Sequence, residues 1–267
     1  MDKIEAIFYI EGLSNDKKAL ESAIADIVNE LKGETLVRVK DVHADDIIES
    51  GDELLKYSGV VEARVEGDLE GLVKAVLKYG PALVEIVGPG KVEVESKDLM
   101  RILGEVSLVM GKLMNQFGSL VAYPDLSDIP EPRIGYSREE VEELITEDRN
   151  LRYRFVIEVS GKDREEVRRI VSKALALEGC RINTFVLQGE TTDEGFKGLA
   201  AAELLSTFDT MFQLTAKYAP VAISIVEPEI VDITANELQN ALTDLGGFVN
   251  ELVTRPLKKR LLSKAEN

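Results

Sequence analysis

The chain has 267 residues, of which 45% are hydrophobic and 30% are charged, and its formal net charge at pH 7 is −17. This composition is typical of a globular protein with one large or two ordinary domains, so disorder is not the default interpretation. Apolar stretches are shorter than the roughly 20 residues of a transmembrane helix, and the first residues lack the pattern of a secretion signal. The single cysteine, Cys180, gives no support for an oxidising compartment. We therefore expect a cytoplasmic protein without a membrane partner.

The negative charge is spread over most of the chain. Residues 1–124 carry a net charge of −9, whereas residues 255–267 hold five lysines and arginines against one glutamate. Proteins that bind nucleic acid usually concentrate basic residues on one face, so we expect no nucleic acid partner. The basic tail is expected either to extend into solvent or to contact an anionic partner.

The chain opens with the pattern of a strand, a helix and a second strand. Residues 4–10 are apolar on both faces, which predicts a central strand. Polar residues 14–16 supply capping oxygens for a helix that Gly33 ends. Alternation over residues 36–42 predicts the second strand.

The next elements complete a first α/β segment. We expect a short helix near residues 45–56, a strand over 60–65, a helix over 69–79 and two short strands over 82–87 and 92–94. An amphipathic helix follows, and its apolar stripe consists of Leu99, Ile102, Leu103, Val106, Val109, Met110 and Leu113.

A proline-containing acidic segment then precedes a second α/β segment. Its prolines predict a stiff, extended connection, and Ser137 begins a short helix whose apolar face indicates that it docks on a domain. The second segment predicts a strand over 153–159, a helix that ends before Gly179, and a strand over 182–187. Further on we expect these elements: a polar surface loop over 189–198 with Thr192 or Asp193 as a helix cap, a long helix over roughly 196–218, strands over 221–226 and 230–233, and a last amphipathic helix.

The two segments are diverged copies of one unit. Lys78-Tyr79-Gly80-Pro81 and Lys217-Tyr218-Ala219-Pro220 lie 139 residues apart, and this spacing gives ten identities over 36 aligned positions. Average composition predicts about two or three such identities by chance. The copies also share the apolar stripe of their last helix, so the sequence predicts a repeated fold.

The repeat defines an expected domain organisation. We assign residues 1–122 to the first repeat, 123–150 to the linker with its short helix, 151–254 to the second repeat and 255–267 to the basic tail. The order β-α-β-(β)-α-β is that of the ferredoxin-like plan, in which helices pack on one face of an antiparallel sheet. We therefore expect an α/β (α+β) protein of two tandem ferredoxin-like repeats.

The second repeat also resembles a family of ligand-sensing domains. Its strand at residues 155–159, followed by a helix and the run Gly179 to Asn183, is similar to the opening of ACT-type domains. This resemblance covers about 40 residues and implies a ferredoxin-like fold that binds a small ligand, with a glycine in the first loop where the ligand approaches. Gly161 occupies that position in the second repeat, whereas the first repeat has Leu13 after Gly12.

Few residues in the chain point to catalysis or metal binding. His43, the only histidine, has carboxylates two and three residues away and is expected either to begin a metal site or to end a solvated strand. Cys180 follows a helix end and precedes an apolar strand, which favours a buried thiol over a nucleophile. Gly88-Pro89-Gly90 lacks the spacing of a phosphate-binding loop and predicts a turn. We expect no metal and no cofactor.

The polar loops of the second repeat are the candidate binding site. Backbone N–H groups at helix starts suit a carboxylate or phosphate, so the ligand-binding residues that we predict are Ser160, Gly161, Lys162, Gly189, Thr191 and Thr192. The stripe of Phe208, Met211, Phe212 and Tyr218 is expected either in the core or on a packing surface.

Three classes of function remain open at this point. The first is a non-enzymatic regulatory or ligand-sensing protein that binds a small anionic metabolite. The second is a structural or accessory subunit that assembles with a protein partner or with itself. The third is an enzyme that uses carboxylates with a tyrosine or a lysine, which the absence of a repeated cluster of such residues in the sequence disfavours.

Overall fold

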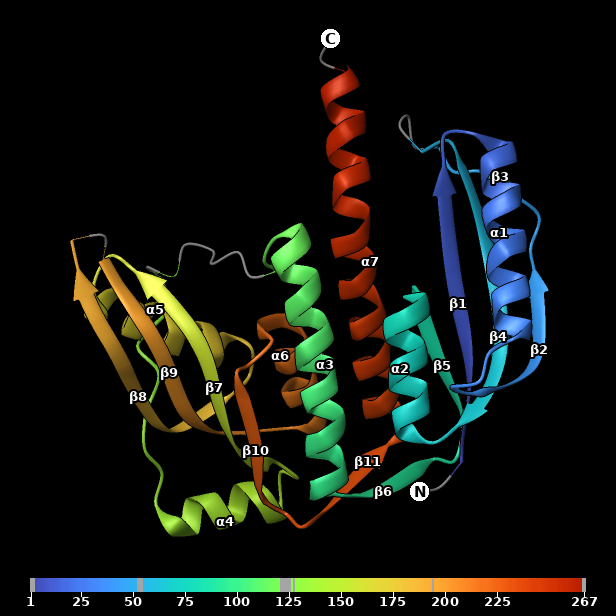
Figure 1. Ribbon diagram of the computed structural model, residues 1–267. Coiled ribbons are helices and arrows are strands. Elements are labelled where there is room, and N and C mark those ends of the chain that lie inside the picture. Colours follow the sequence, from blue (N-terminus) through green and yellow to red (C-terminus); the bar gives the residue numbers. More distant parts are fainter. Residues whose placement is uncertain (1–2, 52–54, 121–125, 127, 194, 266–267) are drawn as a thin grey trace. The chain divides into compact units, whose positions relative to one another are not determined.

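The computed structural model describes residues 3–51, 55–120, 126, 128–193 and 195–265, with side chains on the last helix as far as residue 256. The described residues form an α+β protein with seven helices and antiparallel sheets (Figure 1). The chain divides into two compact units, each of which combines segments that are distant in the sequence. Among the helices in the described ranges, none combines the length and apolar character that crossing a bilayer requires.

Unit 1 comprises Met1–Glu93, Gln116–Gly118 and Ile233–Asn267. Its sheet has the strand order β2-β4-β1-β5, and a short β3 pairs with β4. The bounds of these strands are β1 (Ile4–Ser14), β2 (Arg38–Ala44), β3 (Ile48–Glu49), β4 (Tyr57–Gly67) and β5 (Leu83–Gly88).

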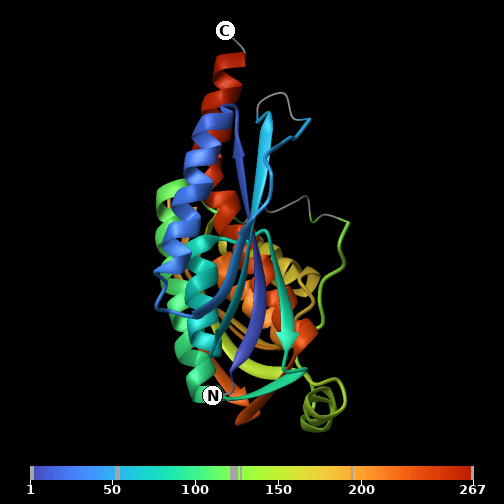
Figure 2. The same cartoon turned by 90° about the vertical axis from the view of Figure 1, so that its right-hand side faces the viewer.

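Two helices of unit 1 cover one face of this sheet (Figures 1 and 2). Helix α1 spans Lys17–Lys32, with the Asp16 side chain accepting hydrogen bonds at its start and Gly33 at its end, as the sequence predicts. Helix α2 spans Leu69–Tyr79. Alternate residues of β1 and β4 point toward the helices because side chains alternate across a strand. These residues form the core and include Ile4, Ala6, Phe8, Ile10, Val61, Ala63 and Val65.

Unit 2 comprises Val94–Asn115 and Ser119–Asp232. Its sheet has the order β10-β7-β9-β8, so that equivalent strands occupy equivalent places in the two sheets. The bounds of its strands and of the helices that follow β7 and β9 are β7 (Leu151–Gly161), α5 (Arg164–Leu177), β8 (Arg181–Thr192), β9 (Gly195–Ser206), α6 (Phe208–Tyr218) and β10 (Ala222–Glu227).

The last helix of each repeat belongs to the unit that contains the other repeat's sheet. Helix α3 (Ser96–Phe117) follows the first sheet in the chain but lies largely within unit 2. Helix α7 (Ala235–Ala265) follows the second sheet and lies within unit 1. Strands β6 (Lys91–Glu95) and β11 (Ile230–Thr234) lead into these helices and pair with each other. The turns before them contain the cis bonds Gly88–Pro89 and Glu227–Pro228, which confirms the predicted turn.

The short helix before the second repeat is confirmed. Helix α4 spans Arg138–Thr146, and Ser137 and Glu140 form a capping box at its start. Val141 on its apolar face is buried. The segment before it is held by Lys173, whose ammonium donates to the Leu126 carbonyl at 3.3 Å and pairs with Glu131. Residues 123–125 and 127 of the predicted linker lie outside the described part of the chain.

Two predicted elements of the second repeat are wrong. Residues 195–206 are strand β9, and the helix begins only at Phe208. Alanine and leucine give residues 199–205 a high helix propensity, but β9 lies between β7 and β8 and exchanges its backbone hydrogen bonds with both. The expected polar loop over 189–198 is therefore mostly a β-hairpin, and neither Thr192 nor Asp193 caps a helix.

Two other expectations also need correction. No helix forms among the described residues of 45–56; the Asp45 N–H donates to the Val60 carbonyl at 2.9 Å, and β3 pairs with β4. The basic tail begins as a continuation of α7 rather than as a separate extension, and its side chains beyond residue 256 lie outside the described part of the chain.

Candidate functional site: a cavity beside strand β7 in unit 2

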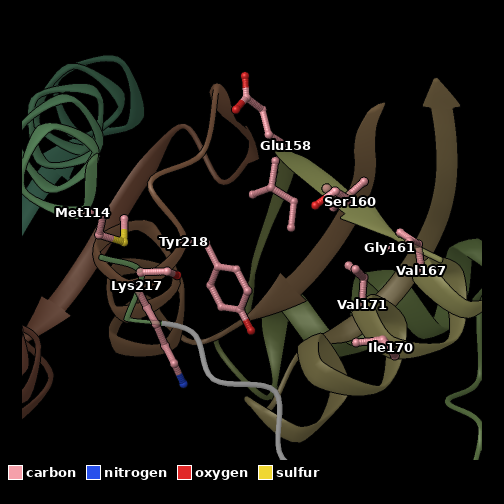
Figure 3. Close-up of a pocket in the computed structure, with 12 residues that line it drawn as sticks. Met114, Glu158, Ser160, Gly161, Val167, Ile170, Val171, Lys217 and Tyr218 are labelled. Atoms are coloured by element: carbon pink, nitrogen blue, oxygen red, sulfur yellow. The ribbon is translucent and has the colours of Figure 1, made fainter. Parts of the chain in front are cut away.

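A cavity of about 260 Å³ lies in unit 2 beside the second half of β7 (Figure 3). Strand β7 continues to Gly161, but its pairing with β10 ends at Val156. Among the described residues, no strand pairs with this side of residues 157–161, and the cavity lies there. The volume is slightly below the usual range of ligand pockets, about 300–1,000 Å³, so the cavity suits a small metabolite.

Helix α5 provides one apolar wall of the cavity. Val167, Ile170 and Val171 lie on its side that faces β7 (Figure 3). The helix comes close to the strand because Gly161 has no side chain; a Cβ there would lie 2.5 Å from Cγ2 of Val167. Gly161 therefore has a packing role in shaping the cavity, in addition to lining it.

The opposite wall comes from the ends of two other helices. Tyr218, at the end of α6, lies across the cavity from Ile170 and Val171, and Met114 of α3 lies beside it (Figure 3). The Tyr218 ring packs edge-on against Phe155, with 6.4 Å between the ring centroids. This contact fixes the position of the ring, because an edge-to-face pair has a preferred geometry.

Polar groups gather at the rim of the cavity. Lys217 and the side chains of Glu158, Ser160 and Ser119 contribute to its lining. The Lys217 ammonium donates a hydrogen bond to Glu178, at the end of α5. An ammonium group has three donor hydrogens, so this ion pair leaves Lys217 able to donate to a second acceptor. The cavity thus joins an apolar interior to a rim that carries one cation, Lys217, and one carboxylate, Glu158.

The first repeat has an equivalent Lys-Tyr pair that already binds a carboxylate. The Glu34 carboxylate accepts hydrogen bonds from the Lys78 ammonium at 2.8 Å and from the Tyr79 hydroxyl at 2.6 Å. Tyr79 in unit 1 is thereby engaged by a carboxylate of the chain itself, whereas Tyr218 in unit 2 lines a cavity.

The predicted site residues lie at one end of the sheet, but only two of them line the cavity. Ser160 and Gly161 do so, whereas Lys162 lies in a separate surface depression with Asp163 and Arg168. Phe196 of β9 pairs with Gly161 on one side and with Thr191 on the other. The remaining predicted residues lie on β8 outside the cavity lining: Gly189, which pairs with Gly198, Thr191, and Thr192, which pairs with Gly195.

The start of α5 offers little room for an anion. The Asp163 carboxylate accepts from the Glu166 N–H at 2.8 Å, and the Glu166 carboxylate accepts from the Lys162 N–H at 3.1 Å. Two carboxylates of the chain therefore already interact with the positive end of the helix. The rim at Lys217 is the better place for an anionic group.

Sequence reasoning did not identify Met114, Ser119, Lys217 and Tyr218 as lining residues. Two of these residues, Lys217 and Tyr218, belong to the Lys-Tyr pair that both repeats share. This identity is a signal that could have located them, but by itself it indicates only that the repeats have a common ancestor. Phe208, Met211 and Phe212 of the predicted core stripe are buried, but Tyr218 is only partly so.

Other chemically notable residues have structural surroundings. Burial raises the pKa of the Cys180 thiol to about 12, and its sulfur lies 3.6 Å from the Tyr153 hydroxyl; the predicted buried thiol is confirmed. His43 Nε2 lies 3.5 Å from Asp45, and both side chains are exposed. Across the described ranges, no three His, Cys, Asp or Glu side chains come together as metal ligands would.

These observations define an α+β protein with two main antiparallel sheets and a partly apolar cavity beside one of them. The chain belongs to the MJ0538 family, whose model matches residues 5–259. It is 28% identical over 258 residues to the uncharacterized protein MJ0538 of Methanocaldococcus jannaschii, an alignment that covers 94% of this chain and 97% of that protein. No solved structure matches the chain.

Proposed function

We propose that the protein is a non-enzymatic ligand-sensing or regulatory protein that binds a small anionic metabolite in the cavity of unit 2. The observation that carries the proposal is the combination of an apolar interior, formed by α5, Tyr218 and Met114, with Lys217 in the lining of the cavity. The apolar part of a ligand would lie between Val171 and Tyr218. A carboxylate or phosphate would accept a charge-assisted hydrogen bond from Lys217.

We also propose that each sheet and its two intervening helices form a ferredoxin-like unit. The strand orders β2-β4-β1-β5 and β8-β9-β7-β10, with antiparallel pairing throughout, support this assignment. The similarity of the second repeat to ACT-type domains is consistent with a ligand-sensing role. The proposal places the ligand beside β7 rather than at the start of α5.

A thermal-shift screen tests the proposed ligand class. We expect a carboxylate- or phosphate-bearing metabolite with a short apolar body to raise the Tm, because a ligand that binds only the native state stabilises it. Lys217→Met should weaken that ligand about tenfold or more, since hydrogen bonds to charged groups contribute about 1.5–3 kcal/mol. Titration calorimetry on both proteins measures the change.

Two controls separate the cavity from general effects of charge. Lys162→Met removes a cation of the same unit outside the cavity and should leave the affinity unchanged. Glu178→Gln removes the partner of Lys217 but keeps its ammonium, so binding should persist. Equal loss of affinity in Lys162→Met and Lys217→Met would contradict a site in the cavity.

A second candidate function, assembly with a protein partner, rests on the open face of the unit 2 sheet. Val156, Ala201 and Val186 lie side by side across three strands, on the face opposite α5. Val186 is 58% exposed and Ala201 is exposed beside it, so this row of apolar side chains is accessible to a partner protein. Absence of any ligand-induced Tm shift would favour this assembly function.

A further inference from the structure

Helix α7 completes an open edge of the unit 1 sheet. Strand β5 is the last strand of that sheet, and within the described ranges its one partner strand is β1. On its other side, the Val84 N–H donates to Oγ1 of Thr243 at 3.1 Å, and the Ile86 N–H donates to Oε1 of Gln239 at 3.1 Å. Edge strands normally leave such groups to solvent or to another strand. Here two side chains one helical turn apart take the place of a strand.

The same helix lies unusually close to the connection between α2 and β5. Gly246 packs against Pro81, and a Cβ at this position would overlap the Pro81 carbonyl oxygen. One turn further on, the Asn250 side-chain amide donates to the Gly80 carbonyl at 2.5 Å. Gln239, Thr243 and Asn250 of α7 therefore form hydrogen bonds with unit 1, and Gly246 allows the close approach.

Helix α3 carries different residues at the equivalent positions. At the spacing of 139 residues, Gln239, Thr243, Gly246 and Asn250 correspond to Met100, Gly104, Ser107 and Gly111. In unit 2 the Ser107 hydroxyl donates to the Pro220 carbonyl at 2.6 Å. A serine thus makes the contact in unit 2 where unit 1 needs a glycine. At the positions equivalent to Gln239 and Thr243, α3 carries Met100 and Gly104, which cannot bond to a strand edge through their side chains.

Both helices are also fixed at their first residue by the unit that they join. The Ala235 N–H, at the start of α7, donates to the Gly90 carbonyl at 2.9 Å. The Ser96 N–H, at the start of α3, donates to the Glu229 carbonyl at 2.8 Å. Gly90 and Glu229 are equivalent positions in the turns that follow β5 and β10, so the two attachments correspond.

We infer that the surface of unit 1 formed by β5 and the α2–β5 connection is a docking surface specific for α7, and that α3 cannot replace it. If α3 lay there, Met100 and Gly104 would leave the Val84 and Ile86 N–H groups unpaired, and Ser107 would overlap the Pro81 carbonyl. Each terminal helix thus belongs to the unit that holds the sheet of the other repeat, which we call the exchange of terminal helices. Polar groups and close packing enforce this exchange, whereas the apolar stripe that both helices share does not distinguish them. This inference is independent of the ligand proposed for unit 2.

Hydrogen–deuterium exchange of the full chain tests the inference. In Gln239→Met/Thr243→Val we expect the β5 amides to exchange roughly fivefold faster for each hydrogen bond lost, because such a bond contributes about 1 kcal/mol. The β10 amides of Ile223 and Ile225 should exchange at the unchanged rate. Mass spectrometry of peptides over 83–88 and 222–227 distinguishes the two strands.

Two further variants make the test reciprocal. Asn240→Ala changes an exposed neighbour on α7 and should alter neither strand. Ser107→Ala on α3 should affect peptides around Pro220 and leave β5 unchanged. Faster exchange of β10 in Gln239→Met/Thr243→Val would show that α7 docks in its own repeat, and unchanged exchange of β5 would show that these side chains do not select the helix. Either result would overturn the inference.

Discussion

Glu34 is a buried carboxylate of unit 1 whose ionisation is strongly perturbed. Its side chain is 3% exposed. Burial by itself raises the pKa, but hydrogen bonds from the Leu36 N–H, the Lys78 ammonium, the Tyr79 hydroxyl and the Thr35 N–H outweigh burial and lower the pKa of Glu34 to about 2. The carboxylate thereby joins the end of α1 to the end of α2.

This pKa makes a prediction about stability at acid pH. A carboxyl whose pKa is lower in the folded than in the unfolded chain stabilises the fold above its ordinary value of 4.5, and that stabilisation is lost as the pH falls toward about 2. Glu34→Gln should therefore lower the free energy of unfolding at pH 7 by on the order of 2–3 kcal/mol. Urea denaturation at pH 7 and pH 3 measures the difference.

Glu30→Gln is the matched control. Glu30 also pairs with Lys78, at 3.0 Å, but its side chain is 55% exposed, and exposed ion pairs contribute about 0–1 kcal/mol. We expect little change in this variant at either pH. An equal effect of the two substitutions would mean that the buried hydrogen bonds of Glu34 contribute no more to stability than the exposed ion pair of Glu30.

At the scale of elements, the adjacent glycines of α7 have opposite roles. Gly246→Ala should destabilise the protein by about 1–3 kcal/mol, because overpacking at a close contact forces the helix away from Pro81. Gly247 faces open space, so Gly247→Ala should stabilise by up to about 1 kcal/mol through helix propensity alone. Thermal unfolding of the two variants should therefore shift in opposite directions; a shared direction would contradict the packing of α7 on unit 1.

Element type could be predicted from the sequence wherever local signals and tertiary context agree. Asp16 and Gly33 mark the ends of α1 because capping is a local interaction. Residues 199–205 were misassigned because alanine and leucine favour a helix locally, whereas the place of β9 between two strands is a property of the fold. The candidate cavity was located only in part: Ser160 and Gly161 follow a predicted strand, but Met114 comes from a helix of the other repeat.

At the scale of the whole molecule, the exchange of helices could not be predicted. The apolar stripe that α3 and α7 share predicts that each helix packs against a sheet. The stripe alone fits either of the two sheets equally well. The information that distinguishes them lies in single polar residues such as Gln239 and Thr243, which appear as ordinary surface positions until the neighbouring strand edge is known.

The exchange predicts how the folded chain responds to a cut in the linker. With a protease site inserted after Asp128, one fragment carries α3, which belongs to unit 2, and the other carries α7, which belongs to unit 1. We expect the cleaved protein to elute as a single 1:1 species in size-exclusion chromatography and to unfold in one transition. Uncleaved protein is the control, and separation of the fragments in native buffer would contradict the reciprocal exchange.

The late position of α7 in the chain also has a consequence for biosynthesis. The ribosome releases the strands of unit 1 first, but the helix that bonds to Val84 and Ile86 follows only after all of unit 2. At about 5–20 residues per second, this delay is on the order of ten seconds. During that interval the nascent chain presents an unpaired strand edge, a structure prone to association with other chains. Unit 1 therefore cannot follow the usual order in which the N-terminal part of a protein folds first.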